Sequence, residues 1–185
     1  MLPDDDIVLN PYYDSGPITL YFGSCLSNFS TIFLNYSVKT EIMAVETRSI
    51  SVSTRGNADM IDITQKISSE IANSSIVEGN ALIFVGGSTA GITTIEFEPG
   101  LKKDYPEFFE KLVPSNRSYK HDDTWHDGNG HSHIRASLQG ASFTVPFVNK
   151  KMLLGTWQQI ILIDFDNRSR NREIIVQLNG RKDNE

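Results

Sequence analysis

The chain has 185 residues, 23 acidic and 17 basic, giving a formal net charge of −6, and its 39% hydrophobic residues exclude wholesale disorder. The net charge is mildly negative, and acidic and basic residues are interspersed along the chain. This argues against a protein that binds duplex nucleic acid or a membrane surface. Its single cysteine, Cys25, excludes a disulfide framework and a cysteine-rich metal site, so we expect a soluble, cytoplasmic globular protein.

The first forty-two residues differ from the rest of the chain. They hold five acidic residues and one lysine. Their most apolar window, 18–38, contains nine Ser, Thr, Asn or Gly residues among 21, which is too polar for a membrane-spanning helix. The acidic start also lacks the basic region of a signal peptide. We expect 1–42 to be an N-terminal appendage, with a true start at Met43 as one hypothesis, and 43–185 to be a single domain.

In the first half of that domain, the sequence pattern predicts strands interspersed with helices. Alternating side chains predict a strand over 45–54. Isoleucines spaced by four predict a helix over 59–74, with Asp59 as its N-cap. Two short strands follow at 81–85 and 92–97. A helix is expected over 99–113, where Pro106 would kink it or divide it into two.

The second half predicts a loop, one helix and several strands. Residues 114–130 are polar and predict a loop, and 132–138 predict a short helix with Ser132 as N-cap. Four strands are expected, at 142–148, 152–154, 157–165 and 172–178. This pattern indicates an α+β fold: a β-sandwich of mostly antiparallel strands with two or three flanking helices.

All four histidines of the chain lie within thirteen residues, with three aspartates among them. Neutral imidazole is a common metal ligand, and a carboxylate can bind a metal or orient a histidine. The cluster therefore predicts a site for a divalent metal, zinc or magnesium, although its spacing matches no helical metal motif. A hydrated surface loop is an equally open interpretation. The predicted ligands are His121, His126, His131 and His133.

Other residues suit anion binding or catalysis. In the small-residue segment 86–91, backbone amides and the hydroxyls of Ser88 and Thr89 could hold an anion, unless the segment only joins two strands. Arg135 could bind a phosphate, although surface arginines are common. Glu96, on the next strand, is expected to be solvated unless it belongs to the site. Trp157 fits a core position or a ligand-stacking one.

Three segments together resemble the YjbQ-like family, also called the secondary thiamine-phosphate synthase family. These are HDDTWHDGNGHSHIRASLQGASFTVPF, GTWQQIILIDFDNRSR and REIIVQLNG, and the resemblance extends from about Val45 to Gly180. It implies a β-sandwich that assembles as a homotrimer, with a pocket near the histidine-rich loop for a metal or an anion. It also implies weak thiamine phosphate synthesis, which joins a thiazole phosphate to an aminopyrimidine diphosphate and can be a side reaction.

The resemblance also implies roles for individual residues. His121 matches the family's His-Asp pair, and His133 matches its Ser-His-Ile. Glu96 matches an acidic residue after the small-residue loop, while Thr156 and Gln158 fall within Gly-Thr-Trp-Gln. Many relatives have His-Thr where this chain has Gly87 and Ser88, so one candidate ligand is missing, and His126 or His131 could compensate.

These observations lead to three hypotheses. In the first, an enzyme uses catalytic His121, His133 and Glu96 on a small phosphorylated molecule, with a divalent metal to neutralise the diphosphate leaving group. Its binding residues would be Ser88, Thr89, Arg135, Thr156 and Gln158. In the second, a homotrimer binds metal or anion without catalysis. In the third, the histidines are polar contacts between subunits.

Overall fold

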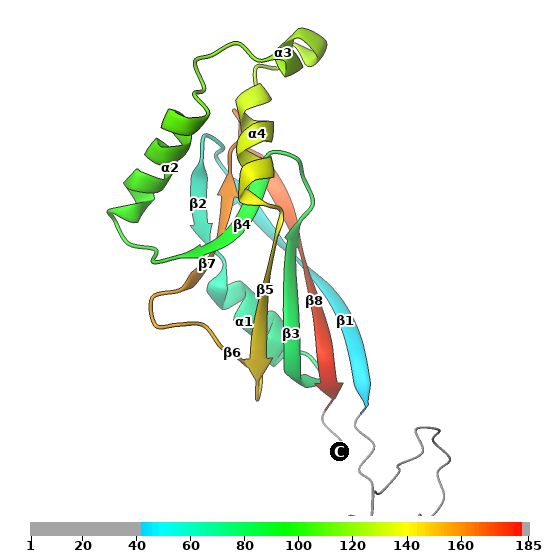
Figure 1. The fold of residues 1–185 in the computed structure, drawn as a ribbon. Helices are drawn as coiled ribbons and strands as arrows, with labels where there is room; N and C mark the ends of the chain where they lie inside the picture. Colours follow the sequence, from blue (N-terminus) through cyan, green and yellow to red (C-terminus); the bar gives the residue numbers. More distant parts are fainter. Residues whose placement is uncertain (1–41, 183–185) are drawn as a thin grey trace, which may run out of the picture. The chain divides into compact units, whose positions relative to one another are not determined.

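The computed structural model describes residues 42–182, so the predicted appendage lies, except for Ile42, outside the described residues. Two antiparallel sheets form the domain (Figure 1). The larger sheet has five strands, in the order β1 (Met43–Thr54), β8 (Arg170–Lys182), β3 (Ile76–Val85), β5 (Ser142–Val148) and β6 (Lys151–Met152). The smaller sheet has three, in the order β2 (Asp59–Asp62), β7 (Gln159–Asp164) and β4 (Ala90–Ile95).

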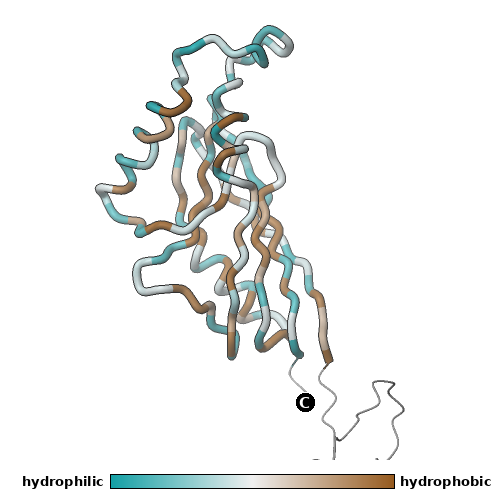
Figure 2. Tube along the Cα trace, in the orientation of Figure 1, coloured by the Kyte–Doolittle hydropathy of each residue, from teal (hydrophilic) through white to brown (hydrophobic). Residues whose placement is uncertain are grey.

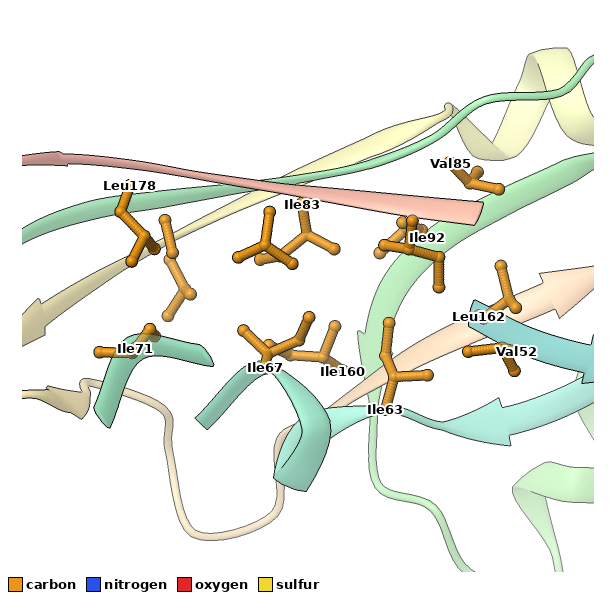
Figure 3. Close-up of a cluster of buried hydrophobic side chains, with 14 of the residues drawn as sticks. Val52, Ile63, Ile67, Ile71, Ile83, Val85, Ile92, Ile160, Leu162 and Leu178 are labelled. Carbon is orange, nitrogen blue, oxygen red and sulfur yellow. The ribbon is translucent and has the colours of Figure 1, made fainter. Parts of the chain in front are cut away.

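The main core lies between the two sheets and is closed at one end by helix α1 (Thr64–Ala72). Ile63, Ile67 and Ile71 follow the helical spacing of four, and all three are fully buried. Figure 3 shows them opposite Ile83 and Leu178 of the larger sheet. The isoleucine pattern recognised in the sequence is therefore the face that seals the sandwich.

Strand β7 is buried on both faces. Ile160 and Leu162 point into the main core, whereas Ile161 and Ile163 belong to a second apolar cluster. That second cluster is covered by helices α2 (Leu101–Leu112) and α4 (Gly130–Gln139). The domain therefore has three layers, and Figure 2 shows hydrophobic residues running along its strands while the segment around helix α3 (Lys120–Trp125) is mainly hydrophilic.

The structure confirms the α+β fold with mostly antiparallel strands and corrects several local predictions. Residues 59–62 form strand β2 rather than the start of a helix, because they pair with β7 after a turn of three positive-φ residues. Helix α2 runs through Pro106 without a break, held by the burial of Phe109 beyond it. Helix α3 lies within the expected loop. Among the helices of residues 42–182, none is long and apolar enough to cross a membrane.

Because side chains on both faces of β7 are buried, shortening one of them should strongly destabilise the domain. Leu162→Ala should lower the free energy of unfolding by about 2–5 kcal/mol, because it leaves a cavity between the sheets. Leu153→Ala is a matched control, since Leu153 is 59% exposed and its loss should cost far less. Urea denaturation of both variants measures the difference. Equal losses would contradict the assignment of β7 to the centre of the core.

Candidate functional site

A pocket of about 670 Å³ opens beside α3 and the start of α4. One part of its lining is apolar and comprises Leu112, Val113 and Ile134. The other part carries cations and imidazoles, from Arg117, Lys120, His121 and His133, with Tyr119 beside them. A concave site with an apolar part and a few polar groups is typical of small-molecule binding.

Two of the four histidines meet at this pocket. His121 lies on α3 and His133 on α4, and their ring centroids are 4.2 Å apart. Nε2 of His121 also lies 3.7 Å from an oxygen of Asp127. The structure thus brings together the two histidines that the family resemblance selected.

The turn between α3 and α4 sets this geometry. Asp122, in the first turn of α3, accepts a hydrogen bond of 3.0 Å from the backbone N–H of Gly130. A side chain at Gly130 would come within 2.5 Å of the Tyr119 Cβ, so only glycine permits α4 to start this close to the pocket wall. His126 ends α3 with a φ of 56°, a left-handed conformation that reverses the chain. Local backbone requirements therefore place His121 and His133 opposite each other.

Burial disfavours the charged forms of two of these imidazoles, His133 and His131. It lowers the pKa of His133 below its ordinary value, and the neighbouring His121 lowers it further. Burial also lowers the pKa of His131, with the charge of Arg135 acting in the same direction. At pH 7 both rings therefore carry a free lone pair, which suits a proton acceptor or a metal ligand.

The other two histidines lie apart from the pair. His131 is buried against Tyr119, with ring centroids 6.2 Å apart, and its Nε2 is 3.2 Å from the hydroxyl of Ser132. His126 is exposed. Across residues 42–182, no three side chains of the His, Cys, Asp or Glu types are placed together to hold a metal. The zinc or magnesium site thus stays a prediction, with His121 and His133 as the histidines that could share an ion.

Arg135, expected to bind phosphate, is instead a buried structural residue. Its Nε and Nη2 donate to the carbonyl oxygen of Val113 at 3.0 and 2.6 Å, and Nη2 also contacts Glu110 at 2.5 Å. These bonds tie α4 to the end of α2. Ser132, expected to cap α4, lies inside the helix and donates to the carbonyl oxygen of Phe165 at 2.6 Å, because the helix begins after Asn129.

Thr89 is likewise committed to the interior, whereas Ser88 is exposed. The Thr89 hydroxyl donates to Asp166 at 2.9 Å and accepts from Arg172 at 2.7 Å. Arg172 also makes two bonds to the buried carboxylate of Asp164, at 2.6 and 2.7 Å. Sequence reasoning missed this network, although a carboxylate at the end of the apolar run 160–163 could have indicated it.

The three remaining predicted residues lie away from the histidine pair. Glu96 follows β4, and Thr156 and Gln158 lie in the segment between β6 and β7, and Figure 1 shows both of these segments away from α3. The side-chain oxygen of Gln158 accepts from the backbone N–H of Gly155 at 2.8 Å and closes a tight turn. Glu96 and Thr156 are exposed. Trp157, also on this turn, is 68% exposed and is not a core residue.

Two residues of the pocket were not singled out by sequence reasoning. Arg117 and Lys120 lie in the polar segment before His121, and both line the pocket. The sequence feature that could have identified them is that two basic residues closely precede His121. The guanidinium carbon of Arg117 lies 5.5 Å from the Tyr119 ring centroid, within the range of a cation–π contact.

Comparison with known proteins identifies the family. A family model described as UPF0047 protein YjbQ-like matches residues 48–181. The chain belongs to the YjbQ-like (UPF0047) family. Among its relatives, UPF0047 protein MJ1081 of Methanocaldococcus jannaschii is 39% identical over 71% of this chain and 92% of its own length. UPF0047 protein YugU of Bacillus subtilis is 33% identical over 72% of this chain and 98% of its own length.

Solved structures of similar proteins share the fold. The crystal structure of a YbjQ-like protein of Sulfolobus solfataricus has a TM-score of 0.71 and 35% identity, covering 75% of this chain and 99% of that one. A protein of Aeropyrum pernix has a TM-score of 0.66 and 30% identity, covering 72% of this chain and 97% of that one. These likenesses extend over the β-sandwich and its helices, and so include the segments that carry the pocket.

The neutral state of His133 can be measured. By ring-proton NMR titration, His131 and His133 should both titrate below 6.5, because burial disfavours their charged forms. His121→Phe keeps a ring in place but removes the electrostatic effect of His121 on His133, so the pKa of His133 should rise while that of His131 stays unchanged. A His133 pKa at or above 6.5 in the unmodified protein would contradict this picture.

Proposed function

We propose that this YjbQ-like protein is a cytoplasmic transferase of the thiamine-phosphate synthase type, with a small phosphorylated heterocycle as its substrate. The observation that carries the proposal is the pocket lining, in which two basic residues and two histidines line the same cavity as an apolar wall. This combination matches the two halves of a phosphorylated heterocycle, an anionic end and a flat, largely apolar end.

The anionic end of the substrate would lie against Arg117 and Lys120. A guanidinium can bind two phosphate oxygens at once, and an ammonium adds a compact positive charge. The contact of Arg117 with Tyr119 restricts the guanidinium before substrate arrives. Arg135, Ser88 and Thr89 are no longer needed for this task, since Arg135 and Thr89 already bond to other residues.

The reaction proposed is a substitution at carbon. The thiazole nitrogen attacks the methylene carbon of the aminopyrimidine diphosphate, the carbon–oxygen bond breaks, and its electron pair leaves with the diphosphate. Arg117 and Lys120 would stabilise the charge that develops on the leaving oxygen. Tyr119, rather than Trp157, would be the aromatic residue that stacks on the pyrimidine, because Tyr119 lines the pocket.

The histidine pair would act at the same phosphate group. His133, neutral at pH 7, can donate its N–H to a leaving oxygen, and His121 lies beside it. A divalent ion held by these two residues would supply further charge neutralisation. Glu96, Thr156 and Gln158 do not line this pocket, so the catalytic and binding roles implied for them would need a second subunit.

The proposal predicts the loss of turnover on removing one imidazole. With thiazole phosphate and aminopyrimidine diphosphate as substrates, His133→Ala should lower kcat by on the order of 10²–10⁴, as expected for a catalytic histidine. His126→Ala removes an exposed histidine outside the pocket and should leave kcat unchanged. Wild-type turnover in His133→Ala would sink the assignment. Phosphate binding without turnover in the wild type would favour the non-catalytic binding protein.

We also propose self-association as a homotrimer, supported by apolar residues on the outer face of the larger sheet. Met43, Val45, Phe84 and Val148 are all at least 42% exposed there. Such a face is commonly covered in an assembly.

Native mass spectrometry tests this part of the proposal. The wild-type chain should give an assembly of three chains of 20.7 kDa each. Phe84→Lys should dissociate it, because a charge would be buried at the contact. Leu138→Lys, at an exposed residue on α4, should leave the assembly intact. A monomeric wild-type protein at micromolar concentration would exclude the trimer.

A further inference from the structure

Strand β1 forms an open edge of the larger sheet (Figure 1). It pairs along its whole length with β8, in one unbroken register from Met43 opposite Arg181 to Thr54 opposite Arg170. Within residues 42–182, no strand pairs with its other side. The other sheet edges are short, because β6 has two residues, β2 four and β4 six. With twelve residues, β1 is the longest unpaired edge of the described domain.

The hydrogen-bonding pattern determines which backbone groups of β1 face this open edge. The N–H of Lys182 donates to the carbonyl oxygen of Ile42 at 3.0 Å, so the backbone groups of Ile42 face β8. Backbone groups alternate in direction along a strand, so the even-numbered residues of β1 face β8 as well. The N–H and C=O groups of the odd-numbered residues therefore point to the open edge. All six of these residues have exposed side chains: Met43, Val45, Thr47, Ser49, Ser51 and Ser53.

None of the usual protections of an edge strand acts at these six positions. Lysine and proline residues commonly block an open edge, and a β-bulge commonly twists it away. Here the six residues are uncharged and include no proline, and the register with β8 runs without a shift. The edge can therefore accept another strand, in the manner of β-augmentation.

Two charged side chains on the other face of β1 restrict which strand can be added. Glu46 and Arg48 form an ion pair at 2.8 Å, and their side chains are 23% and 28% exposed. A strand added at the edge would reduce their contact with water, so it must present matching charges at the same spacing. A second β1 strand, running antiparallel with Thr47 opposite its own copy, meets this requirement. Each Glu46 then lies opposite Arg48 of the other chain.

We propose that β1 is a docking edge for the β1 strand of a second copy of this chain, paired antiparallel about Thr47. The hydrogen-bonded pairs would be Met43 with Ser51, Val45 with Ser49, and Thr47 with itself. With two hydrogen bonds exchanged in each of these pairs and in their symmetry mates, about ten bonds would join the two chains.

Other symmetric registers match the charges less well. A centre at Arg48 would place two guanidinium groups opposite each other, and a centre at Glu46 would do the same with two carboxylates. Like charges directly opposite each other destabilise a strand pair. A centre at Ser49 would place Glu46 opposite Val52 and Arg48 opposite Ile50, so each charge would face an apolar side chain. The register about Thr47 is therefore the one that the charges favour.

The edge contact is independent of the transferase proposal, because no residue of the pocket lies on β1. It is also separate from the proposed trimer, which uses the outer face of the sheet rather than its edge. A single pair of strands buries little apolar surface, and small interfaces are typical of weak association. We therefore expect the edge contact to form at higher protein concentration than the trimer.

Disulfide trapping tests the edge contact and its register. In the full chain with Cys25→Ser, a single Thr47→Cys would place the two thiols in a pair whose Cα atoms are about 5.5 Å apart, within disulfide range. Under mild oxidation at submillimolar concentration, we expect most chains to migrate as covalent pairs on a non-reducing gel. Ser49→Cys in the same background is the matched control. Its two copies would lie about 14 Å apart along the strands and should stay separate.

Proline variants distinguish edge pairing from chance collision. In the Thr47→Cys chain, Val45→Pro removes an N–H that faces the edge and no bond to β8, so it should reduce trapping about tenfold or more. Ser53→Pro changes the same edge beyond the paired stretch and should leave trapping intact. Circular dichroism checks that each variant is folded.

Three results would overturn the proposal. One is equal trapping of Thr47→Cys and Ser49→Cys, which would indicate collision without a register. Another is trapping of Thr47→Cys that Val45→Pro does not reduce, which would place the contact elsewhere. The third is the absence of trapping in every variant, which would leave the edge to solvent or to a strand of another protein.

Discussion

The structure depends on a set of charges buried where β7 ends. Asp164 and Asp166 are fully buried, and Arg172 from β8 pairs with Asp164 at 2.6 Å while Arg170 pairs with Asp166 at 2.8 Å. Burying a carboxylate is costly unless its charge is matched, and here two guanidinium groups and the hydroxyls of Thr54 and Thr89 contact the two carboxylates. Removing one partner would leave an uncompensated charge beneath the helices, so the arrangement permits little variation.

This set of charges also determines where the candidate site lies. Phe165, between the two aspartates, packs on Phe109 of α2 with ring centroids 4.8 Å apart, and its carbonyl oxygen receives the Ser132 hydroxyl of α4. The end of β7 is therefore the point at which both helices attach to the sheets. Because α4 is held there, its first turn projects beyond the core and carries His133 into the pocket. The pocket is thus supported by packed residues on one side and by the more polar helix α3 on the other.

Much of the fold was predictable because strong periodicity reflects burial. The isoleucines of α1 and the alternating residues of β1 gave the right elements, and the succession of strands gave the α+β class. Residues 59–62 were misassigned because a four-residue strand has no period of its own and pairs with a partner about a hundred residues away. Helix α3 was missed because none of its residues is buried, so no apolar face marks it in the sequence.

The candidate site was predictable only in part, since residue type does not reveal whether a polar group is free. His121 and His133 were expected and do meet, but Arg135 and Thr89 were chosen for chemistry that their buried contacts already use. Arg117 and Lys120 resemble ordinary surface residues until the pocket shows what they face.

The turn that contains Gly155 and Gln158 shows why a shared motif is not by itself a site. Its glutamine accepts from the Gly155 N–H and donates its own backbone N–H to the Gly155 carbonyl at 3.0 Å, so this pair of residues accounts for the shape of the turn. Selection for that shape would preserve both residues with no ligand involved. Trp157 is different, because it is exposed and the turn does not require it. Within one chain, the residues suited to binding and catalysis therefore lie beside α3 and the start of α4. The turn between β6 and β7 presents one large exposed aromatic side chain, Trp157.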